Sequence, residues 1–318
     1  MSGERKVTNM KAVRFEEYGG PEVLDVVDVA EPSPGYGEVV VRVIAAGTNP
    51  GESAIRSGVM KEAFPANFPE GQGSDLAGVV SSVGEGVEGV SVGDAVIGMS
   101  DSRNAHAEYT LLPVDRVTPR PVGLDWDAAG SLYLVGTTAE VMMRAVRPAE
   151  GEAVIVSGAA GGVSTLVTQL AIRAGARVIA VASEANHETL RGWGAEPVSY
   201  GDGLEERIRS LAPDGVQALL DAYGGGYVEL ALGMGVPADR IETIIDYDAV
   251  RRHGVHGDGM STLEDPVPAV AELAGMLASG ELELPIKARF PLERVADAYR
   301  EVENRHGLGK VVLEVSTP

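Results

Sequence analysis

The sequence predicts an α/β fold that combines a β-rich domain with a doubly wound parallel sheet. Short Val- and Ile-rich segments split by Gly/Pro turns make up roughly the first 120 residues. From Ala153 onward, strands alternate with helices of about ten residues, and strand signals return after Pro266. The 318 residues therefore predict roughly two domains, with the second inserted into the first.

The β-rich part consists of short strands bounded by turn signals such as residues 31–35 and the glycine-dense stretch 84–93. Many short strands with regular turns are typical of a partly closed barrel or sandwich. The predicted strands are residues 11–15, 23–29, 38–45, 76–83, 95–99 and 107–112.

The α/β part begins after a helix predicted over residues 137–147, which Pro148 and Gly151 end. The alternation that follows indicates βαβ units and a parallel sheet. Its predicted strands are 153–157, 177–182, 197–200, 218–222 and 240–246, and its predicted helices are 163–174, 187–193, 204–212 and 227–234.

The tail predicts a helix over 267–279, an extended segment 286–290, a helix near 295–304 and a last strand 311–315. These elements rejoin the β-rich part. The sequence therefore predicts one domain from residues 10–127 and 267–318 and a second from residues 128–266.

The amino-acid composition excludes several classes of partner and site. With 26 Lys+Arg against 47 Asp+Glu, the net charge of −21 argues against nucleic-acid or anionic-membrane partners. Absence of cysteine excludes disulfides, a thiolate nucleophile and zinc sites that need sulfur. No apolar stretch approaches the roughly 18 residues of a membrane span, and the polar start of the chain is unlike a signal peptide. We expect a cytoplasmic protein.

A glycine turn follows the first strand of the α/β part and opens a helix. Small residues there let the backbone approach a pyrophosphate, whose charge the N–H groups of the helix start favour. Ser164 takes the place of the usual third glycine, and we expect slight crowding from it. A turn with no ligand is the alternative interpretation. The predicted cofactor-binding residues here are Gly158, Ala160, Gly161, Gly162 and Val163.

Whether the chain binds NAD or NADP depends on the residue at the end of the next strand. An acidic side chain there would accept hydrogen bonds from the ribose hydroxyls of NAD and repel the 2′-phosphate of NADP. Ser183 stands there, and Arg191 follows downstream; both could serve the phosphate of NADP. Glu184 could instead face the ribose and favour NAD. We prefer NADP.

Short motifs extend over nearly the whole chain, at residues 17–24, 49–52, 73–79, 93–96, 107–109, 136–139, 158–164, 194–195 and 309–313. In their residues and their order, the chain resembles the zinc-independent quinone oxidoreductase (zeta-crystallin-like) group of the medium-chain dehydrogenases/reductases. The resemblance implies a GroES-like catalytic domain, a Rossmann NADP-binding domain and a homodimer. It also implies NADPH-dependent, metal-free reduction of a quinone or a conjugated enone or enal.

The resemblance also carries residues. Tyr200, with Ser183, matches a pair beside the adenosine 2′-phosphate, and Asn49 and Thr138 match residues beside the nicotinamide. A basic residue that often follows the serine is absent, so Arg191 would have to compensate. The related enoyl-thioester reductases have a tyrosine directly after the position of Gly58, and Val59 and Met60 stand there in this chain. This difference counts against an enoyl-thioester reductase.

Chemistry without a metal suits conjugated acceptors, because they accept hydride without a Lewis acid. Asn49 is the expected catalytic residue, a donor to the developing oxyanion. Two alternatives stay open: a tailoring reductase of secondary metabolism on a specific polycyclic substrate, and a non-catalytic cofactor-binding module that acts as a sensor or binds RNA.

Other polar residues receive ordinary interpretations. His253 and His256 are expected in a surface loop rather than at a metal, and His106 as a strand histidine. Asp75 and Asp94 flank glycines and are expected to form turns.

Overall fold

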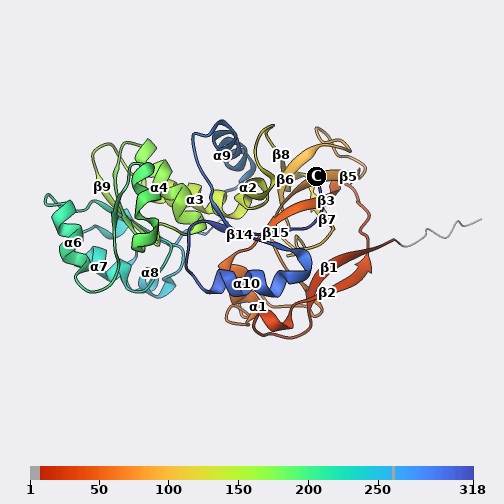
Figure 1. The fold of residues 1–318 in the computed structure, drawn as a ribbon, viewed down its shortest axis with the longest axis horizontal. Helices are drawn as coiled ribbons and strands as arrows, with labels where there is room; N and C mark the ends of the chain where they lie inside the picture. Colours follow the sequence, from red (N-terminus) through yellow and green to blue (C-terminus); the bar gives the residue numbers. More distant parts are fainter. Residues whose placement is uncertain (1–7, 260–261) are drawn as a thin grey trace, which may run out of the picture.

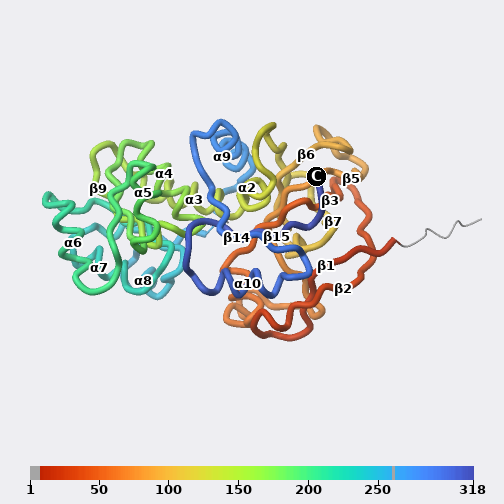
Figure 2. Tube along the Cα trace, viewed as in Figure 1, coloured from red at the N-terminus to blue at the C-terminus, as the bar shows by residue number. Residues whose placement is uncertain are grey.

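The computed structural model describes residues 8–259 and 262–318, which form two lobes along the longest axis of the molecule (Figure 1). One lobe is β-rich and the other contains a parallel sheet, which confirms the predicted two-domain α/β fold. Figure 2 shows the C-terminal segment, in blue, returning to the lobe formed by the red and orange N-terminal segments.

The β-rich lobe contains two sheets. A seven-stranded sheet has the order β14-β15-β3-β5-β6-β8, with β7 also paired to β3, and a three-stranded sheet has the order β2-β1-β4. The strands are β1 (Asn9–Phe15), β2 (Asp25–Ala30), β3 (Glu38–Gly47), β4 (Glu70–Gly71), β5 (Asp75–Val83), β6 (Ala95–Met99), β7 (Tyr109–Pro113), β8 (Val117–Pro119), β14 (Ile286–Pro291) and β15 (Lys310–Glu314).

The second lobe is a five-stranded parallel sheet of order β11-β10-β9-β12-β13. Its strands are β9 (Ala153–Ser157), β10 (Arg177–Val181), β11 (Glu196–Val198), β12 (Ala218–Asp221) and β13 (Ile241–Thr243). The helices of this region are α3 (Leu132–Val146), α4 (Gly162–Arg173), α5 (His187–Gly192), α6 (Leu204–Leu211), α7 (Tyr227–Gly233) and α8 (Tyr247–His253).

Alternation along the central strand β9 builds the core on both faces of the parallel sheet. Val154 and Val156 belong to the apolar cluster shared with α3 and α4, whereas Ala153 and Ile155 belong to the cluster shared with α6, α7 and α8. Because successive strand residues point to opposite faces, one short apolar run supplies both cores.

Four further helices are α1 (Pro50–Arg56), α2 (Trp126–Gly130), α9 (Val267–Ser279) and α10 (Val295–Glu303). Leu273 and Ala274 of α9 join the same apolar cluster as the parallel sheet. The predicted domain limits therefore stay a prediction, because this core continues across them. Among the described residues, no helix combines the length and apolarity needed to cross a membrane.

Several elements differ from the predicted ones. Helices α1 and α8 and strands β4 and β8 were not predicted, and α3 begins at Leu132 rather than at residue 137. Both missed helices carry start signals: Asn49 and Glu52 form a capping box, and the Asp246 side chain accepts the Ala249 N–H. His253, expected in a loop, is the last residue of α8.

The C-terminal segment re-enters the β-rich lobe by passing the glycine turn. The Gly309 N–H donates to the Ala160 carbonyl at 2.8 Å, and β15 then pairs with β14 and β3. Gly309 has φ +92°, and a Cβ there would lie 1.9 Å from the Pro285 carbonyl oxygen. Only glycine fits this crossing.

We predict that Gly309→Ala lowers the free energy of unfolding by at least about 2 kcal/mol, because left-handed backbone strain adds to the clash. Gly275→Ala is the control: Gly275 is an exposed residue of α9 with open space around it, so the change should stabilise by about 0.5–1 kcal/mol. Urea unfolding measures both. A Gly309→Ala chain as stable as wild type would contradict the close approach.

Candidate active site

The glycine turn lies between β9 and α4 and is open to a ligand. Gly161 is exposed, and Gly158, Ala160, Gly162 and Val163 are half-buried. Gly161 caps α4, whose first N–H groups have no partner within the helix. The structure thus places the predicted phosphate-binding residues together at the positive end of a twelve-residue helix.

Ser164 replaces the usual third glycine without loss of packing. Its side chain is buried, and its hydroxyl donates to the Ser157 carbonyl at 3.0 Å. This bond ties the first turn of α4 to the last residue of β9. The hydroxyl therefore has a partner, and the expected crowding is offset by a hydrogen bond.

Asp221 holds the carboxyl ends of three strands together. Its buried carboxylate accepts the Ser157 hydroxyl from β9, the Thr243 hydroxyl at 2.7 Å from β13, and the Gly224 N–H at 3.0 Å. The Tyr223 N–H, at 3.1 Å, is a fourth donor. Three of these donors share Oδ1 and the Thr243 hydroxyl reaches Oδ2, so the carboxylate cross-links the strand ends beside the glycine turn.

Two predicted adenosine-end residues follow neighbouring strands. Val181 of β10 pairs with Val198 of β11, so Ser183 and Tyr200 both lie just past the carboxyl edge of the sheet. Tyr200 is 54% exposed, and the Ser183 hydroxyl accepts a hydrogen bond from Asn186 at 3.1 Å.

Charged residues flank this edge with opposite signs. Glu184 is exposed next to Ser183. Arg191 is exposed in the last turn of α5, and within residues 8–259 and 262–318 it forms no ion pair. Glu184 begins the short 3-10 helix 184–186 and Arg191 lies on α5, which follows it directly in the chain.

Arg305 supplies a cation that the sequence analysis missed. Its guanidinium lies 5.7 Å from the centre of the Tyr223 ring, and the Tyr223 Cβ lies 3.2 Å from where a Gly158 side chain would begin. Arg305 follows α10 of the other lobe, so only the fold brings it toward the turn. No local sequence signal could have found it.

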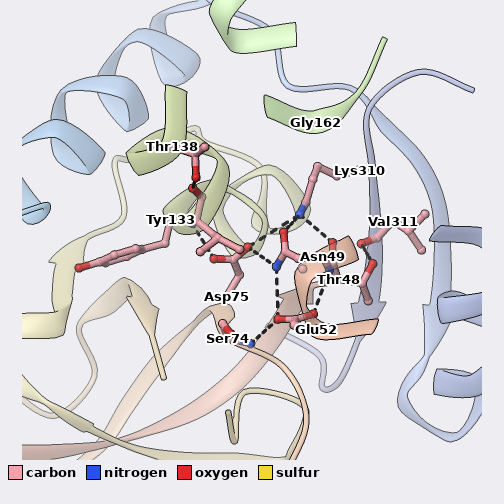
Figure 3. A network of polar contacts seen from close by, with 12 residues as sticks. Thr48, Asn49, Glu52, Ser74, Asp75, Tyr133, Thr138, Gly162, Lys310 and Val311 are labelled. Atoms are coloured by element: carbon pink, nitrogen blue, oxygen red, sulfur yellow. Dashed lines mark hydrogen bonds and ion pairs between the residues drawn. The ribbon is translucent and has the colours of Figure 1, made fainter. Parts of the chain in front are cut away.

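A buried polar cluster faces the glycine turn from the β-rich lobe (Figure 3). The Lys310 ammonium donates to Asn49 Oδ1 at 2.5 Å and to the Thr48 carbonyl at 2.8 Å, and lies 3.8 Å from Asp75 Oδ2. The side chains of these four residues are all 4% exposed or less. A single ammonium thus organises three oxygens from two segments of the chain.

Asn49 has no free hydrogen for a substrate in this arrangement. Its Nδ2 donates to Asp75 Oδ2 at 3.0 Å and to Glu52 Oε1 at 3.3 Å, and its Oδ1 accepts from Lys310. In this geometry the Asn49 amide orients the side chains that it contacts, those of Asp75, Glu52 and Lys310. The geometry does not support the expected role of oxyanion donor.

Glu52 connects the cluster to α10. Its carboxylate accepts the Asn49 N–H at 2.9 Å, the Ser74 N–H at 2.8 Å and the Tyr299 hydroxyl at 2.6 Å. Burial, followed by the nearby Glu52 charge, raises the pKa of Tyr299 well above its usual value. The phenol is therefore a fixed donor.

Asp75 was expected to form a turn, and that prediction is wrong. Asp75 begins β5 with no exposed surface, and its Oδ1 accepts the Leu134 N–H at 2.7 Å. Burial raises the pKa of Asp75, while Lys310 opposes the shift; burial also lowers the pKa of Lys310. Asp94 does form a turn, accepting the Ser91 N–H at 2.8 Å.

Lys310 also contacts the glycine turn itself. A Cβ on Gly162 would lie 2.7 Å from Lys310 Cδ and 3.4 Å from Val135 Cγ1 of α3. Thr138, one turn along α3 from Val135, faces the same region, its hydroxyl donating to the Leu134 carbonyl at 2.7 Å. The close approach of the Lys310 stem thus explains why residue 162 is a glycine.

His106 was expected in a strand, but it lies in the segment between β6 and β7, where its side chain is buried in the core. It has no exposed surface, and burial lowers its pKa, so the ring is neutral. Since a carbonyl only accepts, Nε2 must carry the hydrogen that faces the Gly47 oxygen at 3.1 Å.

The sequence of this chain is similar to those of known dehydrogenases and oxidoreductases. Residues 35–143 match the family described as "Alcohol dehydrogenase GroES-like domain" and residues 193–313 the family described as "Zinc-binding dehydrogenase". Quinone oxidoreductase of Rattus norvegicus is 30% identical over 329 residues, covering 96% of this chain and 97% of the relative. The chain belongs to the quinone oxidoreductase group of the medium-chain dehydrogenases/reductases.

Two further proteins illustrate the range of this group. "NADPH-dependent alkenal/one oxidoreductase, chloroplastic" of Arabidopsis thaliana is 29% identical over 96% of this chain and 79% of its own length. The structure of the quinone oxidoreductase from Coxiella burnetii superposes with a TM-score of 0.85 at 26% identity, covering 97% of this chain and 100% of that one. As a member of the quinone oxidoreductase group, the chain is an oxidoreductase.

The residues at this site do not fit the catalytic zinc that one family description implies. The sequence has no cysteine, and the His106 nitrogen that faces the cluster is a hydrogen-bond donor. Lys310 already compensates Asp75, and Asn49, Ser74 and Tyr299 compensate Glu52. No step of the chemistry is therefore assigned to a metal here.

We predict that Lys310→Met lowers the free energy of unfolding by about 3–5 kcal/mol at neutral pH, since it leaves buried Asp75 without its cation. A buried aspartate with a raised pKa binds its proton more tightly folded than unfolded, so the variant should regain stability as pH falls. The double variant Lys310→Met/Asp75→Asn, which removes both charges, should recover part of the loss. Urea unfolding across pH measures all three, and a pH-independent loss would contradict the pairing.

Proposed function

We propose that this oxidoreductase transfers hydride from NADPH to a quinone or a conjugated enone or enal, without a catalytic metal. One observation carries the proposal: Lys310 of the β-rich lobe packs on Gly162 of the open glycine turn. A dinucleotide held at that turn would therefore extend along the junction of the two lobes, beside the buried polar cluster.

Different residues of the chain would bind different parts of the cofactor. The turn from Gly158 to Val163 and the start of α4 suit a pyrophosphate, because free N–H groups and the helix dipole favour its charge. Arg305 adds a cation from the opposite lobe. Thr138 is assigned to the nicotinamide end. When bound, NADPH supplies the hydride.

The 2′-phosphate is assigned to Ser183, Tyr200 and Arg191. Ser183 and Tyr200 lie past the same sheet edge, and Arg191 is a cation without an ion-pair partner in the described part of the chain. Glu184 weakens this preference for NADPH over NADH. The Arabidopsis relative, by its name NADPH-dependent, supports it.

The acceptor class follows from what the site can stabilise. A saturated ketone needs a Lewis acid or a strong proton donor for its oxyanion. The donor set does not fit zinc, and the Lys310 ammonium and the Tyr299 hydroxyl already donate to Asn49 and Glu52. Conjugated acceptors delocalise the new charge, so positioning and exclusion of water suffice. Lys310, Asn49 and Glu52 would keep the floor of the site rigid, and solvent would supply the proton. The homodimer and the cytoplasmic location stay predictions.

Purified protein mixed with NADPH should consume it when quinones, enones or enals are added, and not when saturated ketones are added. Absorbance of the reduced cofactor measures the reaction. Gly162→Leu is the control, because its side chain would collide with Lys310 and fill the turn. No acceptor-dependent loss of NADPH absorbance with any quinone, enone or enal at saturating concentration would contradict the proposal.

Wild-type protein should bind NADPH more than tenfold tighter than NADH, about 1.4 kcal/mol. Ser183→Glu should weaken NADPH at least tenfold and leave NADH nearly unchanged, because a new carboxylate repels the 2′-phosphate and accepts from the ribose hydroxyls. Calorimetric titration of each cofactor measures this.

Ser210→Glu makes the same charge change on α6, whose last turn lies away from that edge, and should change neither affinity. Equal weakening of both cofactors by Ser183→Glu would remove Ser183 from the phosphate site. Tighter NADH binding by wild type would overturn the NADPH assignment.

A further inference from the structure

Three ligand-type side chains meet at the outer edge of the parallel sheet, away from the polar cluster of Lys310. β13 is the last strand of that sheet, and His256 extends it through a parallel bridge to Glu242. The His256 N–H donates to the Ile241 carbonyl at 2.9 Å, and the Thr243 N–H donates to the His256 carbonyl at 3.1 Å.

Strand geometry explains why the side chains converge. Paired residues of a parallel bridge point to the same face, so Glu242 and His256 are neighbours. Asp258 follows His256 by two positions, which returns its side chain to that face. Its backbone N–H donates to Glu242 Oε1 at 3.0 Å, which holds the segment against β13. Ligand atoms of all three residues lie within 4.8 Å of one another.

Glu242 carries a buried carboxylate that lacks a positively charged partner in the described part of the chain. Its side chain has no exposed surface, and its Oε2 has no hydrogen-bond partner in the described ranges 8–259 and 262–318. No lysine or arginine of those ranges forms an ion pair with it. A buried carboxylate oxygen left in this state is costly, and a bound cation removes the cost.

The rest of the cluster gives an ion access. The side chains of His256 and Asp258 are 36% and 43% exposed, so the site opens to solvent on their side. His256 Nδ1 and Asp258 Oδ2 lie 3.8 Å apart, too far for a hydrogen bond. Close packing fixes the segment between them, since a Cβ on Gly257 would lie 2.5 Å from Val250 of α8.

We infer that Glu242, His256 and Asp258 form a binding site for one divalent metal ion of the zinc class, which joins residues 256–258 to the edge of the parallel sheet. One imidazole with two carboxylates is a donor set that zinc accepts at bond lengths of about 2.0–2.2 Å. Modest side-chain rotation brings all three onto one ion. The site shares no residue with the polar cluster of Lys310, so it leaves the proposed hydride transfer metal-free.

Zinc binding to the full chain, first freed of metal by dialysis against a chelator, tests the inference. Calorimetry with a zinc salt should show one equivalent per chain, and zinc should raise the melting temperature. Glu242→Gln, which keeps the side-chain shape, and His256→Ala should each weaken binding at least tenfold and abolish the thermal shift.

His253→Ala is the matched control, because this histidine ends α8 and faces Glu229 at 3.4 Å instead of the cluster. It should bind zinc like wild type. Absence of zinc binding by wild type would overturn the inference, as would unchanged binding by Glu242→Gln and His256→Ala. Calcium or magnesium binding in place of zinc would overturn the assigned class of ion.

Discussion

A buried ammonium is the constraint on which the junction of the two lobes depends. Lys310 brings a positive charge into a region with almost no water, which is tolerable only with closely placed oxygens. Those oxygens come from the end of β3 and from the start of β5, and the stem of the same side chain presses on Gly162. One residue therefore sets the spacing between the phosphate-type turn and the polar floor that faces it.

The sequence predicted the parts of the molecule that local physics determines. Alternating apolar strands and helices gave the parallel sheet, and the glycine turn gave the start of α4 to within one residue. Helices α1 and α8 were missed although their cap residues were present, because both are short and carry little apolar periodicity. Element existence was thus more predictable where a sequence pattern was long.

Long-range pairing explains what could not be predicted. Asp75 reads as a turn former beside glycines, and only the approach of Asn49 and Lys310 makes it a buried acceptor. Arg305 meets Tyr223 across the junction. The sequence shows His256 near His253 and Asp258, and only the parallel bridge to β13 brings Glu242 beside it. In each case the partner lies on an element distant in sequence, where residue spacing carries no information.

The position of β15 in the sheet has a consequence for synthesis of the protein. β15 follows the inserted parallel sheet in the chain, yet it pairs between β14 and β3 inside the seven-stranded sheet. The seven-stranded sheet is therefore completed only after residues 310–314 have been synthesised, whereas all strands of the inserted parallel sheet are made earlier. Such distant pairings fold slowly. Until residues 310–314 are made, the Ala45–Gly47 end of β3 lacks its β15 partner, whereas the Glu38–Arg42 end already pairs with β7.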